Sequence, residues 1–589
     1  LKTIDQLNGT GYGAVMALIC EACEGQVSSD LGDLGDTIST PETKEFGNGT
    51  NSTRATPTSM QSHSSHSYSW NQSEEKVKVP LYRDPANLGL SLHFWTSGFV
   101  GAGIAASING VFAGYLNVPS YVVNGALSLN ALPVIFSAVL GALSDAKPIL
   151  GFHRRPYMAF GWGLIFVSIS LISCLGLPDP YYCHTPDGNY LLHDPPCNPE
   201  AAHAYVPLLC CFLLATTGMA IASSAGDGLL VQIAKSENED RRGETQAMML
   251  MVQNCGRFCA TFLAAFGFNG RLFTGSFDQR QQLDFSQYAA VFLGPIALTC
   301  VSCIFLIEER KSEKGSMRKF WRSSYHLMEG RAFASVATYL FMSASICNIK
   351  TNAGTWVSLQ WAGVKMIQNQ LAGLVGLIFV ALGTWLMQKY FLNVSWRKII
   401  LGASLSTMAL DSISQFLTIY DIVRDPYFYL GEPIVKEVPA AMMGLVTNLI
   451  ANEVADDTNC ALVIGMLKSI GGIGNPLASL LSNQIFGTFH PSLAERKNFI
   501  EDQPSFRQTV AESYLLSYGF CLLLMAFLPL LPSQKEDAQR RKRDWPYHPG
   551  YAVAGSVVLL VAFLYAFAGD ALILDERMAC SRFLGGKGC

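Results

Sequence analysis

Four charged residues interrupt apolar stretches of this sequence. Asp227 lies within ASSAGDGLLVQ, Arg257 within QNCGRFC, Lys468 within MLKSIGGIGNP, and Asp411 in a fourth apolar segment. A charge at the centre of a membrane helix costs about 2.5–3.5 kcal/mol, so such side chains usually face a cavity or an opposite charge. We therefore expect this set to bind a substrate and protons. For each residue, the alternative is a structural ion pair between helices or a side chain that reaches the membrane interface.

The neighbours of these residues suggest individual roles. Asp227 is flanked by small residues that admit water or ligand. An aspartate in such surroundings can take up and release a proton near neutral pH, so it is the candidate for proton coupling. Arg257 is either the partner of Asp227 or an anion site, and together with Lys468 it would neutralise substrate carboxylates.

A second constellation lies between two apolar segments, in the run LPVIFSAVLGALSDAKPILGFHRRPY over residues 132–157. Its distinctive members are Gly141, Asp145, Gly151, Arg154 and Arg155. The first glycine lets a neighbouring helix approach closely in lipid. The aspartate can pair with either arginine or cap the N-terminus of a facing helix. We expect a gate at the membrane surface; the simpler alternative is an ordinary short loop.

The elements that must position these groups are membrane helices. Charged residues make up 15% of the 589 residues, against roughly 25% in soluble domains. Apolar runs of about 20 residues, each long enough to cross a ~30 Å hydrocarbon core, recur along the chain. They cover residues 91–116, 121–144, 157–177, 204–232, 245–268, 287–307, 332–357, 367–391, 397–419, 432–455, 458–486, 511–532 and 549–572. The sequence predicts an all-α polytopic membrane protein.

The charge of the loops predicts the orientation and the division of the chain. Loops after the second, fourth, sixth, eighth and twelfth segments are rich in lysine and arginine, which places the even loops and the N-terminus in the cytoplasm. The longest basic loop separates two six-helix halves, the arrangement of facilitator-type transporters. The expected parts are a disordered tail (1–79), a first half (80–308), a central loop (309–331), a second half (332–532), a basic linker (533–548) and an extra helix with a tail (549–589).

The sixteen cysteines lie mostly within apolar runs. Cys183 and Cys197 instead share one polar loop, and they can form a disulfide if that loop faces an oxidising compartment. No metal-binding cluster, nucleophile elbow, phosphate loop or nucleic-acid stripe occurs at a convincing spacing. We therefore predict neither an enzyme nor a protein that holds a metal or cofactor or binds nucleic acid.

The gate-like run is similar to the loop between helices 2 and 3 of the major facilitator superfamily. More narrowly, GALSDAKPILGFHRRPY resembles the signature of the folate-biopterin transporter family. The matching residues are Leu132, Pro133, Gly141, Ser144, Asp145, Pro148, Gly151, Arg154, Arg155, Pro156 and Tyr157. The resemblance extends more weakly over about residues 80–532. It implies a multi-pass transporter, in the plasma membrane, for a pteridine, a folate or a similar small solute.

Several membrane positions depart from that family's pattern. The family's helix 2 lysine falls on Ser137, and the first acid of its helix 4 pattern falls on Ala222, whereas Asp227 matches the second acid. The tryptophan after Leu-Pro is Val134. These changes alter which anion or zwitterion the pocket can hold. Two functions stay open: a secondary transporter, proton-coupled through its membrane carboxylates, and a non-transporting sensor or scaffold that kept the fold.

Overall fold

The computed structural model describes residues 87–573 with gaps at 119–128, 186–189, 192–194, 236–243, 274, 276, 310–316, 365, 456–459 and 494–495. The predicted disordered tail and the last residues of the chain lie outside the described residues. Within these ranges the chain is helical, and its β-structure is limited to isolated bridges such as Gly330–Tyr547.

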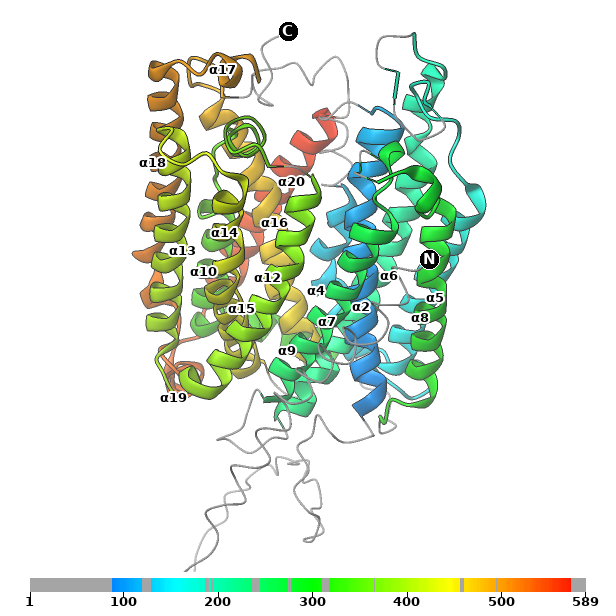
Figure 1. The fold of residues 1–589 in the computed structure, drawn as a ribbon. Coiled ribbons are helices and arrows are strands. Elements are labelled where there is room, and N and C mark those ends of the chain that lie inside the picture. The colour runs from blue at the N-terminus through cyan, green and yellow to red at the C-terminus, as the bar shows by residue number, and fades with distance from the viewer. Residues whose placement is uncertain are drawn as a thin grey trace, which may run out of the picture. The chain divides into compact units, whose positions relative to one another are not determined.

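The described residues of the first half form six helical segments, of which α4 is the last part of the longer span Leu129–Ala146 (Figure 1). They are α2 (Leu88–Asn109) with its π-helical extension η3 (Gly110–Tyr115), α4 (Ser137–Ala146), α5 (Arg155–Leu175), α6 (Tyr205–Lys235), α7 (Glu244–Gly267) and α8 (Phe285–Phe305). Short 3₁₀ turns lie between them at η4 (Pro199–His203), η6 (Arg271–Phe273) and η7 (Gln279–Gln281).

The second half repeats this succession with more interruptions. It contains α10 (Arg331–Ile346), α11 (Gly354–Trp356), η8 (Val357–Trp361), α12 (Met366–Leu386), η9 (Met387–Phe391), α13 (Trp396–Ile419), α14 (Pro426–Val435), α15 (Glu437–Val454), α16 (Cys460–Phe486), α17 (Arg496–Glu501), α18 (Pro504–Met525) and η10 (Leu528–Leu530). Three further helices, α9 (Met317–Glu329), α19 (Lys535–Asp544) and α20 (Pro549–Ile573), lie outside the two halves.

The all-helical membrane architecture is confirmed. Among the described residues, eleven helices are long and apolar enough to cross a membrane. The remaining two expected segments are occupied by α2 and α10. The first carries inward-facing polar residues such as His93 and Thr96, which lower its hydropathy, and the second has only 16 residues before the helix breaks. The protein is therefore an integral multi-pass membrane protein.

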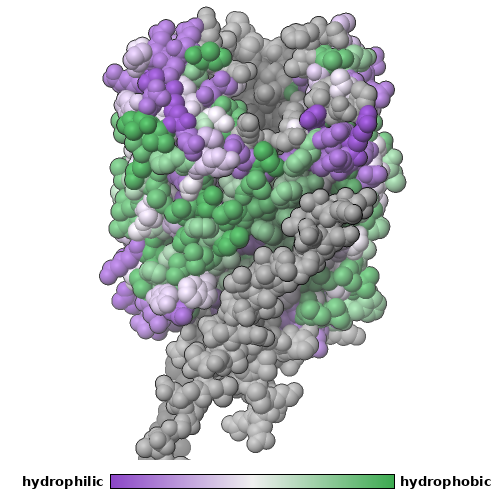
Figure 2. Space-filling model, viewed as in Figure 1, coloured by the Kyte–Doolittle hydropathy of each residue, from purple (hydrophilic) through white to green (hydrophobic). Residues whose placement is uncertain are grey.

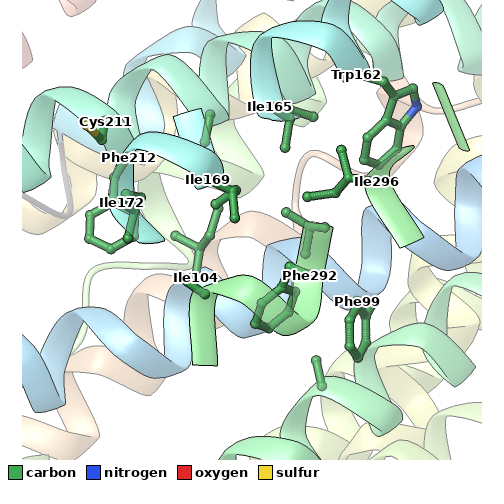
Figure 3. Packing of buried hydrophobic residues seen from close by; sticks show 14 of the residues in the cluster. Phe99, Ile104, Trp162, Ile165, Ile169, Ile172, Cys211, Phe212, Phe292 and Ile296 are labelled. Carbon is green, nitrogen blue, oxygen red and sulfur yellow. The ribbon is translucent and has the colours of Figure 1, made fainter. Parts of the chain in front are cut away.

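Each half has its own apolar core. In the first half, α5 packs against α6 and α8, and α2 packs against α7. Figure 3 shows Trp162, Ile165 and Ile169 of α5 directed toward Ile104 and Phe292 of the facing helices. This packing fixes the backbone of the helices that carry the charged residues.

One end of the membrane bundle carries most of the exposed basic residues and is called the basic end here. The turn between α4 and α5, the amphipathic helix α9 and the charged helix α19 lie there (Figure 1). Figure 2 shows an apolar belt with hydrophilic surface above and below it, as expected for a membrane-spanning body. Helix α20 packs along α16, and its Tyr565 hydroxyl lies 2.8 Å from Gln484 Nε2.

Candidate functional site

Asp145 joins the two halves at the basic end. It lies in the last turn of α4 and forms an ion pair with Arg154, both side chains being at most 2% exposed. Its other carboxylate oxygen accepts a hydrogen bond from the backbone N–H of Leu462, at 2.8 Å, in the first turn of α16. The two pairings that the sequence offered as alternatives therefore occur together. A buried carboxylate is stabilised by this pair of partners, a cation and a helix N-terminus.

Neighbouring groups hold Arg154 and its turn in place. Arg154 Nη1 donates to Ser144 Oγ at 2.6 Å. Glu309, which the sequence analysis did not single out, accepts from the backbone N–H groups of His153, Arg154 and Arg155 at 2.7–3.1 Å, so it caps the start of α5. Gly151 adopts φ 85°, a conformation that favours glycine.

The second arginine of the pair has a different environment. Arg155 donates to the carbonyl of Ile304, near the end of α8, and its guanidinium lies 4.9 Å from the ring centre of Phe152. Among the described residues, its side chain forms no hydrogen bond or ion pair with the opposite half. The contact between halves is thus made by Asp145, which Arg154 pairs with inside the first half, and Arg155 takes no part in it.

Helices α4 and α16 meet backbone to backbone beside this ion pair. A Cβ atom on Gly141 would lie 2.2 Å from the carbonyl oxygen of Ala461, and one on Gly465 would lie 2.2 Å from the carbonyl oxygen of Ser137. Only glycine permits this approach, as expected for close helix packing in lipid. We call Asp145, Arg154, Gly141 and the first turn of α16 the basic-end gate.

A further contact between halves lies at the same end. Gln246, at the start of α7, and Asn452, near the end of α15, are mutually hydrogen bonded at 2.6 Å, and both are buried. This pair was not predicted from the sequence, because an amide side chain in an apolar run does not indicate which residue it will bond.

Asp227 and Lys468 form an ion pair deeper in the same interface. Asp227 lies on α6 and Lys468 about two turns into α16, so the pair also joins the two halves. The lysine side chain is 42% exposed and the aspartate 15%. Because the pair is accessible rather than sealed, water or a solute can reach it and compete for either charge.

His93 lies beside this pair and was also missed by the sequence analysis. The indole N–H of Trp162 donates to His93 Nδ1 at 3.0 Å, which leaves the ring proton of a neutral imidazole on Nε2. A Cβ on Gly226, next to Asp227, would lie 2.4 Å from that Nε2 atom. Lys468 acts electrostatically on the ring. The histidine therefore belongs to the wall of the ion-pair site.

Arg257 does not pair with Asp227, the partner that the sequence offered. Its side chain on α7 is exposed, and no hydrogen bond or ion pair engages its guanidinium within the described part of the chain. The acid that acts on it electrostatically is Glu437, at the start of α15 in the other half. An accessible guanidinium without a direct partner can bind a carboxylate or another planar anion.

Asp411 belongs to a separate polar cluster in the second half. Its carboxylate accepts from the Tyr518 hydroxyl of α18 at 2.7 Å. Glu432 of α14 forms an ion pair with Lys436 at 2.9 Å. The charges of Asp411 and Lys350 also act on its carboxylate. The structure thus separates Asp411 from the Asp227–Lys468 pair by placing it with other partners.

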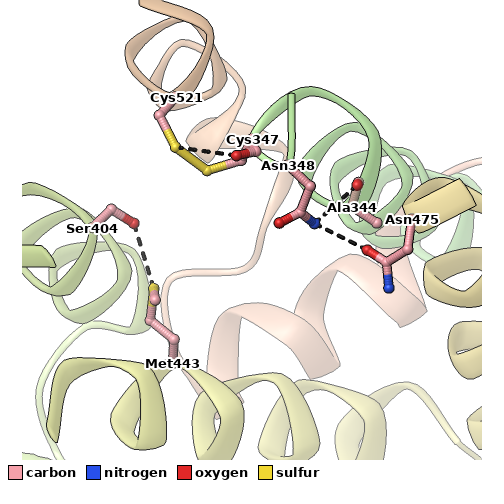
Figure 4. Close-up of a disulfide and its surroundings, with 7 residues drawn as sticks. All are labelled: Ala344, Cys347, Asn348, Ser404, Met443, Asn475 and Cys521. Atoms are coloured by element: carbon pink, nitrogen blue, oxygen red, sulfur yellow. Dashed lines mark hydrogen bonds between the residues drawn. A yellow bond between two sulfur atoms is a disulfide. The ribbon is translucent and has the colours of Figure 1, made fainter. Parts of the chain in front are cut away.

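The described residues contain two disulfides. Cys183 and Cys197 are bonded in the loop between α5 and α6, with their Cα atoms 5.1 Å apart. Cys347 and Cys521 join the end of α10 to α18, a pairing that the sequence analysis did not propose (Figure 4). The next residue, Asn348, hydrogen bonds to Asn475 of α16 at 3.0 Å. This network holds the break after α10 against two helices.

Groups of three or more histidine, cysteine or acidic residues suited to a metal ion are not found among the described residues. Asp456 and Asp457 lie in one of the gaps. Among the described residues, the charged groups that the sequence selected form a buried ion pair at the basic end, a second ion pair between halves at Asp227–Lys468, an arginine without a direct partner and a cluster within the second half.

A family model described as the PUCC protein matches residues 107–351, which is less than half of the chain. A sequence comparison with curated proteins gives no significant match. The solved structures that resemble the chain include transporters of the major facilitator superfamily.

A proton:xylose symporter bound to 6-bromo-6-deoxy-D-glucose has a TM-score of 0.50 and 15% identity, covering 78% of this chain and 98% of that one. A D-xylose–proton symporter has a TM-score of 0.51 and 14% identity, covering 76% and 98%. The human organic anion transporter TETRAN has a TM-score of 0.50 and 12% identity, covering 76% and 100%. These likenesses establish a major-facilitator-type fold with two six-helix halves, and the folate-biopterin resemblance stays a prediction.

Proposed function

We propose that this chain, with its major-facilitator-type fold, is a secondary active transporter of a small organic anion and works by alternating access. Folate, biopterin and related pteridines are the first candidate substrates, because the gate sequence resembles that of their transporters. The observation that carries the proposal is the Asp227–Lys468 ion pair, which joins the two halves at an accessible position.

The gate explains how one side of the protein is closed. The hydrogen bond from the Leu462 N–H to Asp145 crosses between halves, whereas the Asp145–Arg154 ion pair lies within the first half. Separating α16 from α4 breaks the first contact and leaves the second intact. The aspartate therefore stays paired in both conformations, and opening does not expose an uncompensated buried charge.

Anion selectivity rests on Arg257 and Lys468. The arginine has no direct partner among the described residues, and Lys468 becomes available when Asp227 is neutralised. The two cations would then neutralise the carboxylates of the substrate. Pteridines fit this arrangement when they carry a carboxylate, as folate does.

Proton coupling would use Asp227. Protonation removes the negative charge that holds Lys468, which weakens the contact between halves and frees the lysine for the substrate. The Asp411–Tyr518 pair is a second proton-binding candidate, located within the second half.

The test is uptake of radiolabelled folate and biopterin into proteoliposomes with and without an inward proton gradient. Gradient-stimulated uptake that is lost in Asp227→Asn supports coupled transport through this residue. Retention of proton-coupled uptake in Asp227→Asn would exclude the coupling role. Uptake that survives in Arg257→Gln with an unchanged KM would exclude Arg257 as the anion site.

A non-transporting sensor or scaffold is the second candidate. The positions of the missing family charges, Ser137 and Ala222, are used for helix packing: the Ser137 carbonyl faces Gly465, and Ala222 is fully buried against Gly161. Binding of a pteridine without uptake in sealed vesicles would favour this candidate.

A further inference from the structure

Helix α9 is amphipathic, and the residues of its inner face pack against the rest of the protein. Leu327 and Met328 contact the apolar core of the second half, and Ser324 is 2% exposed. The helix also packs against α10 and α20. The remaining face is directed away from the protein.

That outer face combines two cations with two aromatic rings. Arg318 precedes Trp321 and Arg322 by three and four residues, and Tyr325 follows them by four and three, which places the set on one side of a helix. All four are exposed, with Trp321 at 54% and Tyr325 at 47%. Neither arginine has an ion-pair partner within the part of the chain that the structure describes.

The acidic residue of α9 itself does not neutralise this face. Glu329, one turn further along α9, pairs with His326 at 3.2 Å, and the His326 ring stacks on Tyr547. The two arginines therefore present uncompensated positive charge beside exposed aromatic side chains.

The helix lies at the level where the membrane helices end. It ends at Glu329, and the membrane helix α10 begins at Arg331 (Figure 1). Aromatic rings and arginines together are typical of the headgroup region of a bilayer, where rings enter the acyl boundary and guanidinium groups stay with the phosphates.

We propose that the α9 outer face, made of Arg318, Trp321, Arg322 and Tyr325, binds the headgroups of anionic phospholipids in the leaflet at the basic end. The arginines bind headgroup phosphates through paired N–H donors, and the rings contact the upper acyl chains. A soluble anion would satisfy the arginines but leave both aromatic rings in water. The proposal is independent of the transported solute.

The experiment measures binding of fluorescent phosphatidylglycerol and fluorescent phosphatidylcholine to the full-length protein in mixed micelles by anisotropy. We expect tighter binding of phosphatidylglycerol. Each arginine near an anionic surface accounts for about a fivefold change in affinity, so Arg318→Gln with Arg322→Gln should weaken phosphatidylglycerol binding about 25-fold. Arg543→Gln is the matched control, because this 80%-exposed arginine on α19 already pairs with Asp544.

Three results would overturn the proposal: equal binding of the two lipids, an unchanged preference in the double variant, or an equal loss in the Arg543→Gln control. Competition by inorganic phosphate alone would also overturn it, in favour of a soluble anion. If the double variant does not fold, quenching of Trp321 by brominated phosphatidylglycerol is measured instead, as the difference between the parent and Trp321→Phe. Absence of that difference would contradict the proposed contact.

Discussion

Replacement of Asp145 by asparagine tests the basic-end gate directly. The variant keeps the size of the side chain and removes its charge. Asp145 contacts Arg154 within its own half and the Leu462 N–H in the other half. Only the hydrogen bond from the Leu462 N–H differs between a closed and an open gate. The loss of the ion pair with Arg154 lowers the stability of both states equally, so to a first approximation it does not change the equilibrium between them.

The expected size follows from that single contact. A hydrogen bond to a charged group contributes about 1.5–3 kcal/mol and one between neutral groups about 0.5–1.5 kcal/mol, and the charge at a helix N-terminus adds about 0.3–1 kcal/mol. The asparagine oxygen can still accept, so the closed gate should lose about 1–2 kcal/mol. The open fraction should therefore rise about 5–30-fold.

Cys460 provides a native reporter of this change. It is the first residue of α16 and is fully buried beside the gate. Its labelling rate by a membrane-impermeant maleimide, measured by peptide mapping in proteoliposomes, is proportional to the open fraction when opening is fast. Glu309→Gln is the control, because Glu309 also caps a helix N-terminus but within one half.

The outcome is decisive in either direction. Faster labelling of Cys460 in Asp145→Asn, with little change in Glu309→Gln, supports a gate closed by the contact between halves. If Asp145→Asn labels at the parent rate, or if both variants accelerate equally, the reasoning from the Leu462 contact is refuted.

Three other predictions follow from the packing and from the ends of the helices. Gly141→Ala places a methyl group 2.2 Å from a backbone oxygen of α16 and should destabilise the closed gate by about 1–3 kcal/mol, measured as faster maleimide labelling of Cys460. Gly163→Ala is the control, because its methyl group meets nothing within 4 Å and should leave the labelling rate unchanged. Burial alone would raise the pKa of Asp537, but hydrogen bonds from the Ser533 backbone and from α19 arginines lower it to about 2. The stability that it contributes should be present above pH ~4 and lost as the pH falls toward 2, and this part of the pH dependence of thermal unfolding should vanish in Asp537→Asn. Cys183→Ser opens a loop of 14 residues and should destabilise the protein by about 3 kcal/mol, measured as lower thermal stability under non-reducing conditions; an unchanged melting temperature would contradict it.

The sequence was informative where a signal is local. Apolar runs of membrane length located the helices, since the bilayer imposes the same length on each. The motif around Asp145 predicted a gate, because glycine, acid and arginines fall within one short turn. The break after α10 was not predicted: residues 332–357 form one apolar run, and the interruption depends on contacts such as Asn348 with Asn475, 127 residues away.

Two helices, α9 and α19, lie in the stretches that the sequence predicted to be the central loop and the basic linker. Both α9 and α19 were expected to be loops, because their charge dominates their composition. The helical spacing of Arg318, Trp321, Arg322 and Tyr325 was a usable signal for α9. That spacing alone does not predict a stable helix, because a helix with charges on one face forms only when its other face is buried. In α9 the other face is buried against α10 and α20.

The sequence by itself determined the membrane class, the positions of the helices and the residues able to carry charge within them. Which charges meet was decided only by the tertiary structure. The sequence offered Arg257 as a partner of Asp227, but the aspartate pairs with Lys468, 241 residues away, because α6 and α16 pack against each other across the two halves. A charged residue in a membrane helix requires an opposite charge or a polar cavity, but the way the helices pack determines which residue becomes its partner.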